Sequence, residues 1–401
     1  MKKPFLRALA TVGAFSVLLS GCGIFGGDKD EELPPQELVK FEPSLPVDRL
    51  WEAKLGGGSE LLRIGLKPAG NAESVYAASR DGNVSAFDPV TGTRRWRTEL
   101  KLPLSAGPGV GENRVVVASS DGFLVCLGAD DGREIWRTDL AGESLAPPLV
   151  QGEAVVAYTI DGRLSVRSLY NGSERWTLEQ ALPPLTLRGS APPVIVGSTI
   201  IAGFDNGRLI ASGLLDGATR WEVMLSPPTG RSDLERLSDI DGTLASVGQD
   251  VYATAYQGQL AALAAESGQI LWTRDISTHV GVAADLENVY VVSETGELIA
   301  LRRPNGSELW RHDMLLRRSP TAPVTFMNTV VVGDFEGYVH FFSNTDGSPV
   351  ARVRVGKGML SGPPTVIGGR LYVQSESGRL AAFEIETPDA ETTADSANDS
   401  T

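Results

Sequence analysis

Residues 81–87 read Asp-Gly-Asn-Val-Ser-Ala-Phe and are followed by Gly92 and Trp96. An Asp-Gly pair favours a tight turn between two antiparallel strands. After the turn, apolar and polar residues alternate as they do in a half-buried strand. The stretch therefore predicts a β-hairpin, with a further strand around Trp96.

The same spacing recurs along the chain. Six glycines each lie 14 residues before a tryptophan, namely Gly82, Gly122, Gly162, Gly207, Gly258 and Gly296. Each is followed 10 residues later by a second glycine, namely Gly92, Gly132, Gly172, Gly217, Gly268 and Gly306. Gly337 and Gly347 keep the 10-residue spacing but have Ala351 in place of tryptophan, and Gly378 begins one more unit. Self-similarity at a period of ~40–45 residues indicates a repeat architecture of eight units.

Each unit also contains a β-branched run upstream of its turn, such as Val115–Val117 or Val330–Val332. With about four short strands per unit, the pattern predicts an all-β, eight-bladed β-propeller over residues 47–387. The eighth unit has no outer strand, whereas Trp51 has no unit before it. We therefore expect the N-terminal strand to complete the last blade. All seven tryptophans are expected to pack between blades.

The N-terminal residues have the pattern of an export signal. Lys2, Lys3 and Arg7 precede an apolar run at residues 8–19, too short to span a membrane. The run ends in Leu-Ser-Gly before Cys22, which resembles a bacterial lipobox. We predict that residues 1–21 are a lipoprotein signal peptide and that Cys22 is lipidated. Gly23 follows the cysteine, and by resemblance to enterobacterial sorting it favours the outer membrane.

Both flanks of the repeat lack the composition of a folded domain. Residues 22–46 are rich in glycine, proline and acids, which predicts a lipidated N-terminus and a flexible acidic tether. Residues 388–401 contain acids, no bases and no large apolar side chain, which predicts a disordered acidic tail.

Composition excludes several classes of function. The formal net charge of −14 argues against nucleic-acid binding. With 2 cysteines and 3 histidines, the chain has no basis for a disulfide framework or a histidine-rich metal centre. Cys126 lies in an apolar strand and is expected in the core. His279, His312 and His340 fall in different blades, so we expect structural or surface roles for them.

The glycine and tryptophan spacing resembles the repeat of quinoprotein dehydrogenases, which marks a fold and not a reaction. Dehydrogenases of that kind resemble one another in a vicinal cysteine pair and a calcium site, and this chain has no Cys-Cys. We therefore predict no catalytic residue, no metal and no enzymatic activity. A periplasmic quinone-dependent dehydrogenase, or a peptide- or glycan-binding propeller, is kept as the alternative.

Variation in length is confined to the connections between units, and the two long adjacent ones follow Trp176 and Trp221. Insertions of this kind often mark the binding face. In residues 182–189 the prolines favour an extended chain, with Leu185 and Leu187 on one side and Arg188 on the other. Residues 232–242 mix leucines with charges. The two connections could pack over the blade ends or form a docking patch for a protein. Asp239 to Gly242 also hint at a calcium loop, but no bidentate glutamate follows.

Together, the lipobox, the tether, the ring and the segments 185–189 and 236–241 resemble the BamB family of outer-membrane protein assembly lipoproteins. The resemblance implies a non-enzymatic scaffold, anchored in the outer membrane and facing the periplasm. It also implies docking on the periplasmic POTRA domains of the barrel protein BamA, through Leu185, Leu187, Arg188, Asp239 and Asp241. Unfolded outer-membrane proteins are a further expected partner. No cofactor is implied apart from the covalent lipid on Cys22.

Overall fold

The computed structural model describes residues 33–58, 62, 64–189, 191–228, 231–360 and 362–386. Residues 35–386 form one compact unit, which contains every strand of the described ranges. The predicted signal peptide, the lipidation site at Cys22 and the acidic tail lie outside the described residues. Within the described ranges, no helix is long and apolar enough to cross a membrane.

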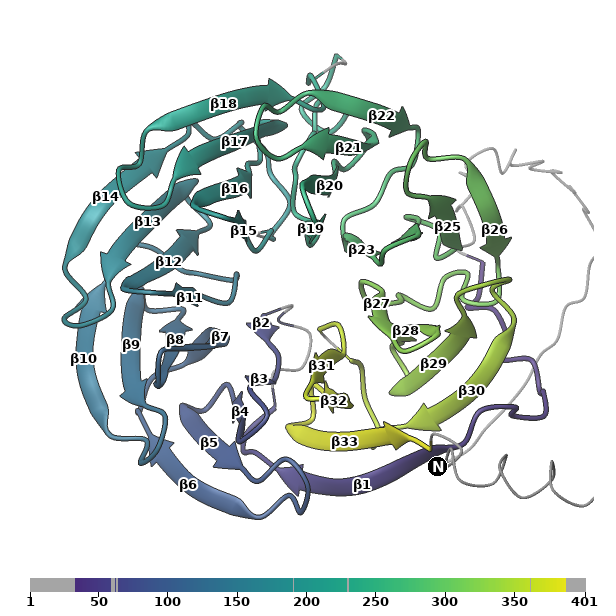
Figure 1. Cartoon of the computed structure of the whole chain (residues 1–401), viewed down its shortest axis with the longest axis horizontal. Coiled ribbons are helices and arrows are strands. Elements are labelled where there is room, and N and C mark those ends of the chain that lie inside the picture. The colour runs from purple at the N-terminus through teal and green to yellow at the C-terminus, as the bar shows by residue number, and fades with distance from the viewer. Residues whose placement is uncertain are drawn as a thin grey trace, which may run out of the picture. The chain divides into compact units, whose positions relative to one another are not determined.

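Residues 35–386 form a ring of eight antiparallel blades, which confirms the predicted eight-bladed propeller (Figure 1). The first blade contains β3 (Ala69–Gly70), β4 (Val75–Ala78), β5 (Asn83–Phe87) and β6 (Arg94–Glu99). The second contains β7 (Leu104–Gly111), β8 (Arg114–Ser119), β9 (Phe123–Gly128) and β10 (Glu134–Asp139). The third contains β11 (Leu149–Gln151), β12 (Ala154–Thr159), β13 (Arg163–Ser168) and β14 (Glu174–Glu179).

The remaining blades repeat this order. The fourth contains β15 (Val194–Val196), β16 (Thr199–Gly203), β17 (Arg208–Gly213) and β18 (Thr219–Met224). The fifth contains β19 (Ala245–Val247), β20 (Asp250–Thr254), β21 (Leu260–Ala264) and β22 (Ile270–Arg274). The sixth contains β23 (Val282–Ala284), β24 (Asn288–Val292), β25 (Leu298–Arg302) and β26 (Glu308–His312). The seventh contains β27 (Val324–Phe326), β28 (Thr329–Gly333), β29 (Tyr338–Ser343) and β30 (Pro349–Arg354).

The eighth blade closes the ring with both ends of the chain. It contains β31 (Thr365–Ile367), β32 (Arg370–Gln374), β33 (Arg379–Ile385) and, as its outer strand, β1 (Val47–Lys54). β1 is antiparallel to β33, with Trp51 opposite Ala382, so the predicted closure is confirmed. A short strand that the repeat does not predict, β2 (Gly65–Leu66), pairs in parallel with β7 inside the ring (Figure 1).

The tryptophans join neighbouring blades, as predicted. Each indole nitrogen donates to a backbone carbonyl of the next blade, for example Trp136 to Leu169 at 2.8 Å. The other six pairs are Trp51–Pro89, Trp96–Ala129, Trp176–Leu214, Trp221–Ala265, Trp272–Arg303 and Trp310–Asn344. The acceptor turn carries the second glycine of that blade, which the indole covers. The same contact explains why Ala351 stands where a tryptophan is expected. The eighth blade takes its outer strand from the N-terminus and therefore has no glycine turn for an indole to cover.

Between the blades, the side chains of adjacent sheets interleave in apolar clusters, such as that of Tyr76, Val84, Val115 and Leu127. Cys126 is fully buried in the cluster between the second and third blades, as expected for a core residue. Burial raises the pKa of its thiol to about 12.

The described part of the predicted tether differs from a free chain. Gln36 donates its N–H to the carbonyl of Leu316 at 3.0 Å. Ser44 and Leu45 both donate to the carbonyl of Val350, at 3.0 and 3.1 Å. Residues 36–45 therefore lie along the seventh blade, held by backbone hydrogen bonds that proline and acid content does not reveal.

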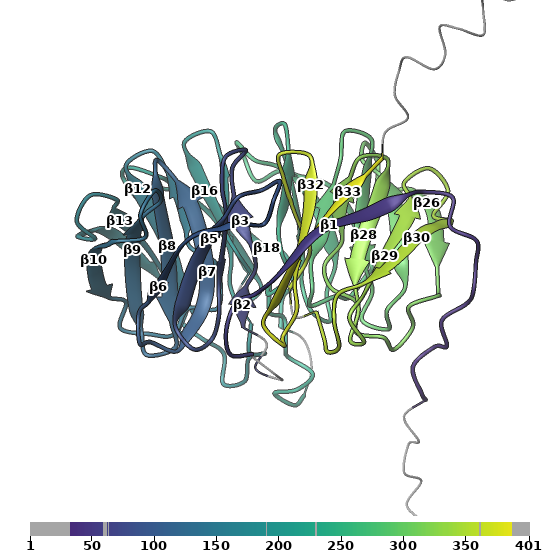
Figure 2. The same ribbon diagram turned by 90° about the horizontal axis from the view of Figure 1, so that it is seen from below.

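The two faces of the ring have different connections (Figure 2). Antiparallel order places the turns within the outer and inner hairpins of each blade on one face, here called the turn face. The connections between successive blades lie on the opposite face, here called the loop face. The long connections at 180–193 and 225–244 both belong to the loop face, so the repeat positions them side by side.

Candidate partner-docking site

Two connections on the loop face build the candidate site. The first loop, residues 180–193, joins β14 to β15, and the second loop, residues 225–244, joins β18 to β19. The backbone N–H of Leu187 donates to the carboxylate of Asp239, which ties the first loop to the second. The second loop is in turn held to the ring by Tyr256, whose N–H donates to the carbonyl of Asp239 at 2.9 Å. The two segments singled out in the sequence therefore adjoin one another.

The side chains of the first loop do not alternate as predicted. Leu185 is 43% exposed, whereas Leu187 is half-buried. Leu187 and Arg188 nevertheless line the same cavity, so they are not on opposite sides of the loop. The reason is that residues 182–189 form no strand, and the period of two therefore does not apply.

Arg188 is oriented by a residue that the sequence did not indicate. Its Nη2 donates to both carboxylate oxygens of Glu143, at 2.9 and 3.0 Å. Its Nη1 donates to the carbonyl of Leu62. A charge-assisted contact to both oxygens fixes the guanidinium plane more firmly than a single hydrogen bond does. Glu143 comes from the connection between the second and third blades, and only the ring brings it to Arg188.

Of the two predicted aspartates, Asp239 is almost fully buried, at 1% exposed. One of its oxygens accepts from Leu187, and the other has no hydrogen-bond partner. Both oxygens of Asp241 are also buried without a partner. Asp241 packs against Gly189, where a Cβ would lie 2.7 Å from its Cγ, so the first loop needs glycine at this position. Asp239 is therefore a tie between the loops, and Asp241 lies at the surface of the cavity.

A third carboxyl, Asp205, joins these two from the turn between β16 and β17. Burial, and then the nearby charge of Asp239, raise the pKa of Asp205 to about 7. Burial raises the pKa of Asp239 to about 6, against the hydrogen bond from Leu187. Burial, Asp205 and Asp239 together raise the pKa of Asp241 to about 8. Near neutral pH the cluster therefore retains protons that isolated aspartates would have lost.

The site borders a cavity of about 560 Å³ on the loop face. Its lining comes from connections around the whole ring, including Leu145, His279, Arg317 and Met359, so the cavity lies on the central axis. Lys67, next to β2, also lines the cavity, and burial lowers its pKa. Leu187, Arg188 and Asp241 thus line a central depression, although the carboxyl oxygens of Asp241 are buried. Leu185 is exposed on the same loop.

The arrangement does not resemble a metal centre. Across the described ranges, no group of three or more histidine, cysteine, aspartate or glutamate side chains is placed to hold a metal ion. Asp239, which belongs to the segment that resembles a calcium loop, instead accepts a hydrogen bond from the N–H of Leu187. His340 is buried beside Asp334, His312 packs on Trp310, and His279 lines the cavity, so the three histidines do not converge.

Comparison with known proteins identifies the family. The family model described as outer membrane protein assembly factor BamB matches residues 80–312 and 299–391. A BamB of Pseudomonas aeruginosa is 43% identical over 376 residues, covering 94% of this chain and 98% of that protein. A BamB of Alkalilimnicola ehrlichii is 43% identical, covering 96% of this chain and 98% of its own length.

Solved structures agree at the level of the fold. The crystal structure of BamB from Moraxella catarrhalis superposes with a TM-score of 0.77 at 28% identity, covering 84% of this chain and 100% of that chain. Quinohemoprotein alcohol dehydrogenase from Comamonas testosteroni gives a TM-score of 0.67 at 12% identity, covering 86% of this chain and 78% of that enzyme. Identity that low shows a shared fold alone. The relatives, by contrast, match over nearly their whole length, and the chain belongs to the BamB family.

Proposed function

We propose that this chain is a non-enzymatic scaffold of the machinery that folds and inserts outer-membrane β-barrel proteins. Family membership supports the proposal, since the relatives are named outer membrane protein assembly factors. Such a role places the ring at the outer membrane, facing the periplasm. It requires a surface that binds another subunit, and it requires no reactive group.

The proposed partner is the POTRA region of BamA. One observation carries the docking site: Leu187, Arg188 and Asp241 line the same cavity. Asp239 accepts from the N–H of Leu187, and Leu185 is exposed on the same loop. An exposed apolar anchor beside an oriented arginine is the composition expected of a binding hot spot. Unfolded outer-membrane proteins are proposed as a second partner, added as strands along the outer blade edges.

The proposed anchor is a lipid on Cys22, with no other cofactor. A lipid tether would hold the ring near its membrane-embedded partner and raise the effective concentration for docking.

The experiment is a detergent pull-down with tagged mature protein, comparing the parent with Leu185→Ala, Arg188→Ala and Asp241→Ala. Matched controls lie on the turn face: Leu215, 72% exposed, and Arg220, which pairs with Asp216 at 3.2 Å. We expect each site variant to weaken BamA binding by ~1–3 kcal/mol, seen as reduced recovery. Thermal unfolding of Leu185→Ala and Arg188→Ala should match that of the controls, and Asp241→Ala is compared with the control proteins at equal folded fraction.

Equal recovery by all variants would keep the assembly role and discard this docking site. Failure of the parent to recover any barrel protein would contradict the assembly role itself. A bound quinone with dye-reducing activity, or retention on glycans, would then favour the alternative functions.

A further inference from the structure

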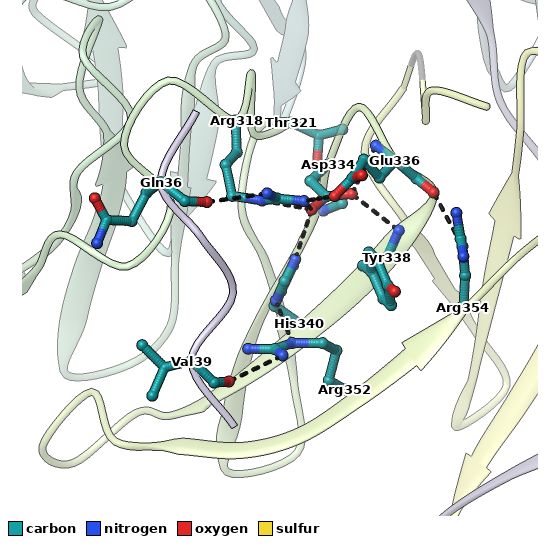
Figure 3. A network of polar contacts seen from close by, with 11 residues as sticks. Gln36, Val39, Arg318, Thr321, Asp334, Glu336, Tyr338, His340, Arg352 and Arg354 are labelled. Carbon is teal, nitrogen blue, oxygen red and sulfur yellow. Dashed lines mark hydrogen bonds and ion pairs between the residues drawn. The ribbon is translucent and has the colours of Figure 1, made fainter. Parts of the chain in front are cut away.

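The segment at residues 36–45, here called the strap, is fastened to the seventh blade by two arginines (Figure 3). Arg318 donates from Nη1 to the carbonyl of Gln36 at 3.0 Å. Arg352, on β30, donates from Nη1 to the carbonyl of Val39 at 3.1 Å. The guanidinium of Arg352 also lies 5.0 Å from the ring centroid of Phe41, a cation–π distance. The two arginines therefore hold the strap at Gln36 and at Val39 and Phe41, whereas its other end is held by backbone hydrogen bonds to Val350.

A buried carboxylate holds the first arginine in place. Asp334 Oδ2 accepts from Arg318 Nε at 3.0 Å and Nη2 at 2.8 Å. The same oxygen lies 3.0 Å from His340 Nε2. Asp334 is fully buried and Arg318 is 4% exposed, so this pair is shielded from solvent. Glu336 contacts the same guanidinium from the blade surface.

The second arginine depends on the protonation of His340. Arg352 Nε donates to His340 Nδ1 at 3.2 Å, so Nδ1 must be unprotonated. His340 Nε2 then carries the ring proton and donates it to Asp334. The geometry therefore assigns a neutral imidazole in one tautomer, placed between a carboxylate and a guanidinium.

The charged groups around His340 are Asp334, Arg318 and Arg352, and the ring of Tyr338 lies 6.1 Å away. Burial lowers the pKa of His340 below its ordinary value of 6.5, and the two arginines act in the same direction, against Asp334. If Nδ1 of His340 took up a proton, its N–H would face the Nε–H of Arg352. Two donors on two cations cannot form a hydrogen bond and repel each other, so the contact between Arg352 and His340 would be lost.

We propose that Arg318 and Arg352 form a clasp that closes the strap onto the seventh blade, and that a proton on His340 opens it at Arg352. The clasp is closed above pH 6.5, where His340 is neutral, and opens as the pH falls through the lower pKa of the folded protein. Opening frees the carbonyl of Val39 and the ring of Phe41 together. Gln36, Ser44 and Leu45 stay held by Arg318, Leu316 and Val350, so the part of the strap that loosens is the stretch around Val39 and Phe41.

The test reads strap mobility directly and does not depend on the anchor or on docking. A nitroxide label is attached at Lys40→Cys, an exposed strap position between Val39 and Phe41, in the mature chain with Cys22→Ser. Cys126 is buried and does not compete for the label. We expect a restricted spectrum near pH 7.5 and a growing mobile component as the pH falls below 6.5 through the lowered pKa of His340, reversible on return.

Two variants separate the parts of the device. Arg352→Met keeps the stem but removes the donors, and we expect a mobile label at both pH values. His340→Gln cannot take up a proton, and we expect a spectrum independent of pH. A pH-dependent transition that persists in His340→Gln would overturn the proton switch, and a restricted label in Arg352→Met would overturn the clasp. The parent titration is a test by itself, since a label already mobile near pH 7.5 contradicts the closed strap.

Discussion

The indole of Trp51 occupies the space in which a Cβ of Gly92 would stand, with 2.6 Å between that position and two indole carbons. Gly92 also has a φ of +69°, a conformation that favours glycine. The remaining six tryptophans cover the second glycine of the next blade in the same way. The recurrence of the second glycine thus reflects a contact with the tryptophan of the neighbouring blade.

Gly92→Ala should therefore destabilise the protein more than the same substitution at a turn glycine that no side chain covers. Gly152 is the matched control, because it has a φ of +54° and no other residue within 4 Å of the place that a Cβ would take. We expect about 1 kcal/mol of lost unfolding free energy for Gly152→Ala from backbone strain alone. Gly92→Ala should lose a further ~1–3 kcal/mol from overpacking. Urea unfolding measures both, and equal losses would contradict the role of the indole.

Ala351→Trp would restore the sequence pattern, and we expect it to destabilise the ring. Ala351 is 3% exposed and packs beside Val339, Phe341 and Phe383. No glycine turn exists in the eighth blade to receive an indole, so the larger side chain should cost ~1–3 kcal/mol or more. A thermal melt checks this, and an unchanged or raised midpoint would show that the interface has unused space.

Asp241→Asn should flatten the dependence of stability on pH. The folded-state pKa of Asp241 is raised from 3.8 to about 8, so the folded protein binds more protons than the unfolded chain in this interval. Stability of the parent should therefore fall as the pH rises from about 4 to about 8. We expect asparagine to gain ~2 kcal/mol over the parent between pH 5 and pH 8. Urea unfolding at both pH values measures this, and an equal effect at each would contradict a buried, proton-retaining carboxyl.

Glu143→Gln should weaken docking through Arg188. The substitution keeps the shape of the side chain but removes the charge that orients the guanidinium at 2.9 and 3.0 Å. We expect a loss of ~0.5–1 kcal/mol in BamA binding, smaller than that of Arg188→Ala. Glu134→Gln is the control, since Glu134 pairs with Arg137 at 2.8 Å on the outer strand β10. An equal loss of BamA binding in both variants would show that the change in net charge, and not the contact between Glu143 and Arg188, causes the effect.

The fold could be predicted because two turn glycines and a tryptophan recur at a fixed spacing within each unit, and only the distance from one unit to the next varies. Gly82 and Gly92 mark turns, and Trp96 marks the strand that covers the next blade. The loop segments could be located because they are the places where that distance varies. Asp205 and Glu143 could not be predicted as parts of the site, because each lies in another connection and meets the loops only through the curvature of the ring.

The strap was missed for a different reason. Its hydrogen bonds to Leu316, Val350, Arg318 and Arg352 use backbone groups, which every residue carries. Hydropathy and charge therefore predict a linker at residues 36–45. The two arginines that hold these residues lie roughly 300 positions further along the chain, so the local sequence does not reveal the contact. Asp239 shows the same limit, since its charge suggested an exposed contact while its structural role is to accept from a backbone N–H.

The pairing of Val47 with Ile385 also constrains the order in which the molecule can be completed. Seven blades consist of consecutive strands and can form from local sequence as the chain emerges, but the eighth requires two segments roughly 330 residues apart to meet. Until the last strand is available, β1 is an unpaired edge at one end of an open arc. Ring closure is therefore the late, entropically costly step of folding, and a chain that stops short of β33 leaves its first strand without a partner.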